Sequence, residues 1–264
     1  MSTGTTGQPG TSSQPAPPAG EAAPAPRPLT PCPPAVVHAD DPTAEDLTTW
    51  ADRLEEVRRS LASPVVGRIV VVAQTASTQE AAARMAGDLT PGEPGLLVVA
   101  GSQYAGRGTH GRGWSSGPMG LALTMALPGA DDPPEWLSLS VGLGVYRACA
   151  GLLEPGVARS LRVKRPNDVV LLRPDGSRAK VAGILVERRT LASGPVTLIG
   201  IGVNVRHTRG DWPPDLDGRA VSLAQLGSGA SRIAVAQRLL AECSRVRAMD
   251  QAALELELGE RLIN

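Results

Sequence analysis

The sequence predicts an α+β fold in which helices flank a mixed, largely antiparallel sheet. Three observations favour this class. Apolar residues make up 42% of the 264 residues, which is enough for a sizeable core. β-Branched runs cluster in two regions, after an expected helix that ends near residue 86 and after another that ends near residue 153. They do not alternate regularly with helices. No internal repeat is visible, which argues against a repeat architecture.

The first third of the chain predicts two helices with a strand between them. Large apolar residues recur at helical spacing over residues 42–62 and indicate the first helix. Arg68–Thr75 is a β-branched run typical of a strand. Ser77 and Glu80 then form a Ser-x-x-Glu capping box, which predicts an Ala-rich helix through about residue 86.

The rest of the chain predicts further strands, a glycine-rich loop and a helical C-terminal region. The stretch from Gly101 to Gly120 has too many glycines for regular structure. The apolar runs predict strands over Gly95–Ala100, Leu121–Leu127, Leu161–Lys164, Val169–Leu172, Val181–Arg188 and Val196–Val205, one helix over Pro134–Leu153, and two helices between Ser231 and Leu262.

The N-terminal segment differs from the remainder in composition. Residues 1–35 hold ten of the 24 prolines, two charged residues and almost no large apolar side chains. Such a segment cannot offset its ordering entropy by burial. We therefore expect a disordered tail over residues 1–35 and one folded domain over residues 36–264. The tail lacks the apolar core of a signal peptide.

Charge and composition exclude several classes of function. Lys plus Arg and Asp plus Glu both number 26, so no net charge attracts the protein to nucleic acid or to a membrane surface. Aromatic residues are only 2% of the chain, too few for a base-stacking surface. The three cysteines show neither metal-type spacing nor an even count for disulfides. We expect a cytoplasmic protein that binds no nucleic acid and enters no membrane.

The glycine-rich stretch contains a pattern that resembles a dinucleotide-binding fingerprint. Gly106, Gly108 and Gly111 satisfy G-x-G-x-x-G, but that fingerprint must open a helix, and the glycines and proline that follow forbid one. A flexible backbone carrying Arg107 and Arg112 suits a phosphate or carboxylate instead. A solvated basic loop is the alternative interpretation of this segment alone.

Three later clusters also combine charge with strand ends. They are Lys-Arg-Pro-Asn-Asp from Lys164 to Asp168, Lys-Val-Ala-Gly-Ile-Leu-Val-Glu from Lys180 to Glu187, and Gly-Ile-Gly-Val-Asn from Gly200 to Asn204. Taken singly, each has a plain structural explanation: a turn, a solvated charge at a strand start, or an asparagine that caps a strand end. Taken together and in this order, the clusters indicate one site.

The ordered set of motifs resembles the biotin–protein ligases. The set runs from Ser-Thr-Gln at 77–79 through Gln-x-Ala-Gly-Arg-Gly-x-x-Gly-Arg-x-Trp at 103–114 to the three clusters above, and the resemblance spans residues 68–206. It implies the class II synthetase-like catalytic domain that these enzymes share with lipoate ligases. The Arg-Arg and His-Asp-x-Gly-Asn signatures of the lipoate ligases are missing from this sequence.

The resemblance implies a two-step reaction that attaches biotin to protein. Biotin and Mg²⁺-ATP give biotinyl-5'-AMP and pyrophosphate, and a lysine of a biotin carboxyl carrier protein then takes the biotinyl group. ATP and Mg²⁺ are therefore the expected cofactors, biotin is the substrate, and the carrier protein is the expected partner. At the family level the protein is expected to be a monomer or a homodimer.

The resemblance also assigns site residues. It implies that biotin is bound by Ser77, Thr78, Gln79, Gln103, Arg107, Gly108, Thr109 and Lys180. It implies that the nucleotide is bound by Arg112, Trp114, Lys164, Asn167 and Asn204, and the metal by Asn167 and Asp168. Lys180, Arg107 and Lys164 are the implied catalytic residues. This assignment is chemically consistent, because attack of a carboxylate on a phosphate needs fixed positive charge more than a protein nucleophile.

The chain departs from the family pattern in four places. Thr109 replaces a second loop arginine, and Arg165 replaces the usual tryptophan before Pro-Asn-Asp. The N-terminal region is too short for the winged-helix domain of some members, and the sequence stops about where a C-terminal β-barrel begins in others. These departures leave two alternatives open: a degenerate biotin or adenylate binder with poor turnover, and a ligase for another acyl group such as lipoate.

Thr109 predicts leaky retention of the adenylate. Losing one charge-assisted hydrogen bond costs about 1.5–3 kcal/mol, or roughly 10- to 150-fold in affinity. We expect released adenylate to label lysines of bystander proteins, measured as biotin incorporated into an unrelated protein in the same reaction. A low background of such labelling would contradict this expectation.

Overall fold

The computed structural model describes Met1, residues 47–129 and residues 135–264. All its helices and strands lie in one compact unit, Val37–Asn264. The disordered tail predicted over residues 1–35 falls outside the described residues, as does the predicted start of the first helix at residue 42.

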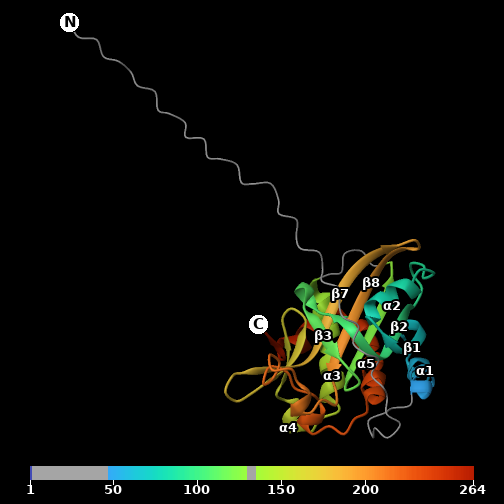
Figure 1. The fold of residues 1–264 in the computed structure, drawn as a ribbon. Helices are drawn as coiled ribbons and strands as arrows, with labels where there is room; N and C mark the ends of the chain where they lie inside the picture. Colours follow the sequence, from blue (N-terminus) through green and yellow to red (C-terminus); the bar gives the residue numbers. More distant parts are fainter. Residues whose placement is uncertain (2–46, 130–134) are drawn as a thin grey trace. The chain divides into compact units, whose positions relative to one another are not determined.

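A single mixed sheet of nine strands organises the described residues. Its strands are β1 (Val66–Thr75), β2 (Gly95–Arg107), β3 (Gly113–Ser116), β4 (Gly120–Pro128), β5 (Leu161–Lys164), β6 (Asp168–Leu172), β7 (Arg178–Leu191), β8 (Gly194–Asn204) and β9 (Leu262–Ile263). The order across the sheet is β1-β2-β4-β8-β7-β6-β5-β9, and β3 pairs with β2. β1–β2 and β5–β9 are parallel, and the other pairs are antiparallel. This arrangement confirms the predicted mixed, largely antiparallel sheet (Figure 1).

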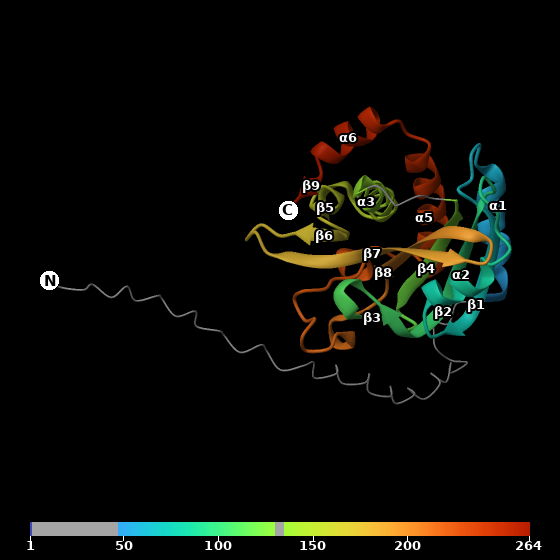
Figure 2. The ribbon, with the colours of Figure 1, turned by 90° about the horizontal axis from the view of Figure 1, so that it is seen from above.

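Helices lie on both faces of the sheet. The α-helices are α1 (Trp50–Ser60), α2 (Thr78–Met85), α3 (Glu135–Ala150), α4 (Pro155–Ala158), α5 (Arg232–Arg247) and α6 (Gln251–Gly259). Figure 2 shows α3, α5 and α6 on one side of β7 and β8, with β3 and the segment that follows β8 on the other side. Among the described residues, no helix is long and apolar enough to span a membrane.

Side-chain alternation along the strands divides the core between the two faces. On β2, Leu97 and Val99 belong to the large cluster that also contains residues of α1, α3 and α5. Their neighbours Leu96 and Val98 belong to the smaller cluster with the alanines of α2. Successive side chains of a strand point to opposite faces, so one apolar run fills both layers. The continuous apolar runs of the sequence therefore become strands buried on both sides.

The glycine-rich stretch corrects one prediction. Residues 101–120 were expected to be irregular, yet β2 continues to Arg107 and β3 covers Gly113–Ser116. The glycines do not break the strand. They allow its backbone to lie close to that of the neighbouring strands. A Cβ at Gly101 would lie 2.7 Å from the Ala73 carbonyl oxygen, and a Cβ at Gly106 would lie 2.5 Å from that of Trp114. Strand pairing therefore overrides the low intrinsic propensity of glycine.

The capping box predicted at the start of α2 is also corrected. Ser77 occupies the N-cap position, but its side chain makes no capping hydrogen bond. Glu80 instead contacts Arg107 and Arg189 from neighbouring strands. Side-chain caps are present on α5 and α6, where Ser231 and Asp250 accept bonds from backbone N–H groups. The tertiary ion pairs of Glu80 thus replace the local bond that the sequence pattern suggested.

Truncating a buried leucine of α1 should destabilise the fold much more than truncating an exposed leucine. Leu54 is 0% exposed, whereas Leu256 on α6 is 76% exposed. Leu54→Ala should lower the free energy of unfolding by about 2–5 kcal/mol, because it removes buried contacts and leaves a cavity. Leu256→Ala is the matched control and should change it little. Urea titration of both variants checks the difference, and similar losses would contradict this core.

Candidate active site

Two adjoining cavities lie beside β7 and β8. The first, about 430 Å³ to its open mouth, is lined by Thr78, Gln79, Gln103, Arg107, Gly108, Thr109, Trp114, Ala122, Asn167, Lys180, Gly183, Ile184, Leu185, Gly200, Ile201 and Gly202. The second, about 1360 Å³, is lined by Gly108, Thr109, Arg112, Gly113, Trp114, Lys164, Pro166, Asn167, Asp168, Val170, Arg178, Lys180, Asn204, Trp212, Leu216, Arg219 and Ala220. Both cavities share Lys180, Trp114, Asn167 and the Gly108–Thr109 pair, so they meet at these residues.

Glycines of β7 and β8 form the floor of the first cavity. Gly183 and Gly202 are directly paired across the two strands. A Cβ at Gly202 would lie 2.2 Å from Cε2 of Trp114, and a Cβ at Gly200 would lie 2.8 Å from Nε2 of Gln79. Any larger side chain would therefore displace the groups that lie over the sheet. The spacing Gly-x-Gly reflects the two-residue period of a strand, which turns both glycines to the same face.

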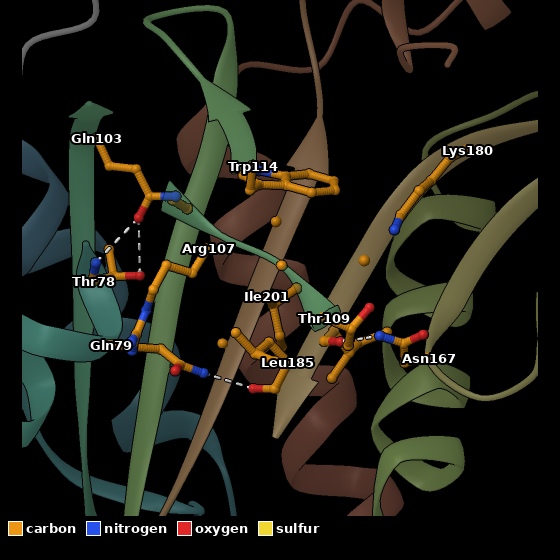
Figure 3. A pocket seen from close by; sticks show the side chains of 16 residues that line it. Thr78, Gln79, Gln103, Arg107, Thr109, Trp114, Asn167, Lys180, Leu185 and Ile201 are labelled. Atoms are coloured by element: carbon orange, nitrogen blue, oxygen red, sulfur yellow. Dashed lines mark hydrogen bonds between the residues drawn. The ribbon is translucent and has the colours of Figure 1, made fainter. Parts of the chain in front are cut away.

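Polar side chains from α2 and β2 form one side of the first cavity (Figure 3). The Thr78 backbone N–H donates to Oε1 of Gln103 at 3.1 Å, and Nε2 of Gln79 donates to the Leu185 carbonyl at 2.7 Å. Two buried polar atoms on the lining residues lack a protein partner: Oε1 of Gln79 and Nε1 of Trp114. Buried polar groups are normally satisfied, so this acceptor and this donor indicate a ligand with complementary groups.

Lys180 lies at the junction of the two cavities. Its Nζ is 2.6 Å from Oδ1 of Asp168 and 5.3 Å from the centroid of the Trp114 ring. Ala179, Val181 and Ala182 all belong to the core on the other face, so alternation is interrupted here. The register between β6 and β7 shifts at this point, where Val170 pairs with Lys180 and Val169 with Ala182. This β-bulge turns Lys180 toward the cavities.

Most of the charged side chains that line the second cavity are basic. Five basic side chains and one carboxylate, that of Asp168, line it. The basic residues are Arg112, Lys164, Arg178, Lys180 and Arg219. Such an excess of cations favours a polyanionic ligand, and arginine guanidiniums suit phosphate oxygens in particular.

The segment after β8 completes the second cavity by pairing with β7. The Lys180 N–H donates to the Arg219 carbonyl at 2.8 Å, and the Val221 N–H donates to the Lys180 carbonyl at 3.0 Å. The side-chain Nδ2 of Asn204 donates to the same Lys180 carbonyl at 2.9 Å. Trp212, also in this segment, stacks on buried His207 with ring centroids 4.3 Å apart. Burial lowers the pKa of His207, which favours its neutral form beside Trp212.

Arg107 lies in a cluster of charges at the edge of the first cavity. Its Nη2 is 2.8 Å from Glu80 and 3.0 Å from Glu187. Arg189 contacts the same two carboxylates. The pKa of Glu80 is lowered, chiefly by its hydrogen bonds from Arg189. The cluster joins the end of β2 to α2 and to β7.

The structure brings nearly all of the residues singled out from the sequence together. Thr78, Gln79, Gln103, Arg107, Gly108, Thr109 and Lys180 line the first cavity, and Arg112, Trp114, Lys164, Asn167, Asp168 and Asn204 line the second. Ser77 lines neither; it is buried at the N-cap of α2. Sequence reasoning missed the carboxylate partners of Arg107 and the contributions of Arg178, Trp212 and Arg219. No local motif marks these three: Arg178 lies on β7 before the Lys180 motif, and pairing of β7 with a distant segment brings in Trp212 and Arg219.

The comparisons with known proteins agree with this geometry. Residues 71–205, just over half of the chain, match the family model described as the Biotin/lipoate A/B protein ligase family. The biotin–[acetyl-CoA-carboxylase] ligase of Mycobacterium tuberculosis is 35% identical over 198 residues, which cover 70% of this chain and 68% of that protein. The bifunctional ligase/repressor BirA of Bacillus spizizenii is 31% identical over 188 residues, but the match covers only 55% of its length.

A solved structure shows the same fold. The biotin protein ligase from Aquifex aeolicus, in complex with biotin and ATP, superposes with a TM-score of 0.58 and 25% identity, covering 74% of this chain and 78% of that one. The family match, the relatives and the fold agree with the motifs and cavities described above. The chain belongs to the Biotin/lipoate A/B protein ligase family.

Proposed function

We propose that this chain is a biotin–protein ligase, which activates biotin with ATP and transfers it to a lysine of an acceptor protein. The observation that carries this proposal is the pair of cavities joined at Lys180. One cavity is small and offers neutral hydrogen-bonding groups, and the other is large and basic. A reaction that joins a carboxylic acid to a nucleoside phosphate needs this combination in one site.

Biotin fits the first cavity by its chemistry. Its nearly planar ureido ring can lie against a floor of glycines and offers both N–H donors and a carbonyl acceptor. Oε1 of Gln79 can accept from a ureido N–H, since its amide Nε2 is already bonded to the Leu185 carbonyl. Thr78 and Gln103 supply further hydrogen-bonding groups. The biotin carboxylate would then point toward Lys180.

ATP is the proposed ligand of the second cavity. Lys164, Arg112 and Lys180 line it and can neutralise the triphosphate. In the first step a biotin carboxylate oxygen attacks the α-phosphorus, and the bond from that phosphorus to pyrophosphate breaks. Lys180, which both cavities share, can contact the attacking carboxylate and the α-phosphate together. Its positive charge reduces the repulsion between the two anions and holds them in place.

Magnesium fits the oxygen donors beside Lys180. Asn167 donates through Nδ2 to the Ile184 carbonyl, which leaves its Oδ1 as an acceptor on a residue lining both cavities. Asp168 adds a carboxylate, although Lys180 shares it. Mg²⁺ commonly binds through one or two protein oxygens plus phosphates and waters. We propose that Asn167 and Asp168 would hold it, and that a bound Mg²⁺ would supply positive charge beside the phosphates.

In the second step, an acceptor lysine attacks the carbonyl of biotinyl-5'-AMP, forming the amide and releasing AMP. We propose a biotin carboxyl carrier protein, met in the cytoplasm, as this acceptor. This route needs no covalent enzyme intermediate, because biotinyl-5'-AMP is itself the activated acyl donor.

Biotin-dependent exchange of labelled pyrophosphate into ATP tests the first step directly. The purified chain should catalyse exchange that requires biotin and Mg²⁺ and is not supported by lipoate. Lys180→Gln should lower the exchange rate by about 100-fold or more, as expected when a charge that stabilises the transition state is lost. Exchange with lipoate but not biotin would favour the other acyl group. No exchange by a folded protein that still binds biotin would favour the degenerate binder.

The glycine floor provides a second test. Gly202→Ala would place a Cβ 2.2 Å from Trp114, whereas a Cβ at Gly229 has no atom within 4 Å. Displacing the indole costs about 1–3 kcal/mol, so Gly202→Ala should weaken biotin binding by about tenfold. Gly229→Ala is the matched control and should bind like the original chain. Equal biotin affinity of both variants, measured by calorimetry, would contradict binding on this floor.

A further inference from the structure

Arg107 is engaged by protein carboxylates although it lines the first cavity. A single nitrogen, Nη2, lies 2.8 Å from Oε1 of Glu80 and 3.0 Å from Oε2 of Glu187. Glu80 lies in the first turn of α2, and Glu187 lies on β7. To bring Nη2 to an anionic ligand in the cavity, the guanidinium must therefore give up these contacts.

A second arginine contacts the same carboxylates more extensively. Arg189 binds Glu80 through both terminal nitrogens, with Nη2 donating to Oε1 at 2.6 Å and Nη1 donating to Oε2 at 3.0 Å. Its Nη2 also donates to Oε2 of Glu187 at 3.3 Å. The pKa shift of Glu80 agrees, because the hydrogen bonds from Arg189 contribute more to it than the charge of Arg107. Glu80 is thus held mainly by Arg189.

We propose that Arg189 is a positioning residue that frees Arg107 to exchange between these glutamates and the anionic ligand. The inference rests on the proposed function and on the sequence-based expectation that Arg107 binds biotin, whose carboxylate makes it an anionic ligand. When Arg107 turns to the ligand, Arg189 still compensates Glu80 and Glu187. Without Arg189, the same movement would leave Glu80 and Glu187 without either of these two arginine ion pairs, and only the charge of Arg84 would still act on Glu80, so Arg107 would stay with the glutamates.

A purely structural role for the cluster makes a different prediction. The four side chains are 29% to 39% exposed. Ion pairs at such exposure contribute little to folding stability. If Arg189 only joined β7 to α2, its loss would lower the thermal stability slightly and would leave the affinity for biotin unchanged.

The test compares Arg189→Gln with variants that restore the charge balance. Arg189→Gln should raise the KM for biotin in pyrophosphate exchange by about tenfold, the loss expected when one charge-assisted hydrogen bond is no longer available. The KM for ATP should change little, because Arg107 is absent from the residues lining the second cavity. Arg189→Lys should retain most of the affinity. Adding Glu187→Gln to Arg189→Gln should restore it, because Arg107 then leaves one carboxylate instead of two.

Arg68→Gln is the matched control. Arg68 also pairs with a carboxylate, that of Asp88 at 2.8 Å, but on edge strand β1 and outside both cavities. It should leave both KM values unchanged. An unchanged biotin KM in Arg189→Gln, or no recovery in the double variant, would overturn the inference.

A second measurement separates this inference from the proposed function. If the original chain shows no exchange, the proposed function fails, but biotin affinity can still be measured by calorimetry. A tenfold weaker affinity in Arg189→Gln, recovered in the double variant, would then support the role of Arg189 in binding. Equal affinities, or no binding of biotin by the original chain, would overturn it.

Discussion

The site depends on the antiparallel pairing of β7 with β8. This pairing places Gly183 opposite Gly202 and Leu185 opposite Gly200, so three glycines expose the backbone in one part of the sheet. Trp114 and Gln79 can lie against the backbone there only because these glycines carry no side chain. The other face of the same strands carries isoleucines and valines of the main core. One ladder therefore provides both the stability of the domain and the space for a ligand.

Charge is distributed unevenly around these glycines. The first cavity is bounded by neutral amides and hydroxyls, with Arg107 neutralised by carboxylates at its edge. The second cavity has five basic residues and one acidic residue. Lys180 stands between them because the bulge in β7 turns it away from the core. A neutral and a basic compartment thus meet at one ammonium group, which suits chemistry that joins a small acid to a nucleotide.

Much of this arrangement could be predicted from the sequence, because apolar runs and ordered motifs carry it. The mixed sheet, seven of its nine strands and most of the motif residues that line the cavities follow from those patterns. The extension of β2 through the glycine-rich stretch could not be predicted, because glycine has a low strand propensity. That stretch is held as a strand by its pairing with β1 and β3, which the sequence does not show. Arg178, Trp212 and Arg219 could not be predicted either. Trp212 and Arg219 reach the cavity through the bridge between Lys180 and Ala220, which leaves no local signal, and Arg178 lies on β7 two residues before Lys180, outside any motif.

The pairing of β5 with the short strand β9 affects the order in which the parts of the site fold. Backbone bonds join Val163 to Arg261 at 3.0 Å and Arg165 to Ile263 at 2.9 Å, on either side of Lys164. These bonds link segments far apart in the sequence, whereas β7 and β8 form a local hairpin. Strand pairs between distant segments form later in folding than local hairpins. A pair of only two residues also opens at a lower free energy than a long one. The glycine floor would become rigid early in folding, and the backbone around Lys164 would remain open to hydrogen exchange for longer.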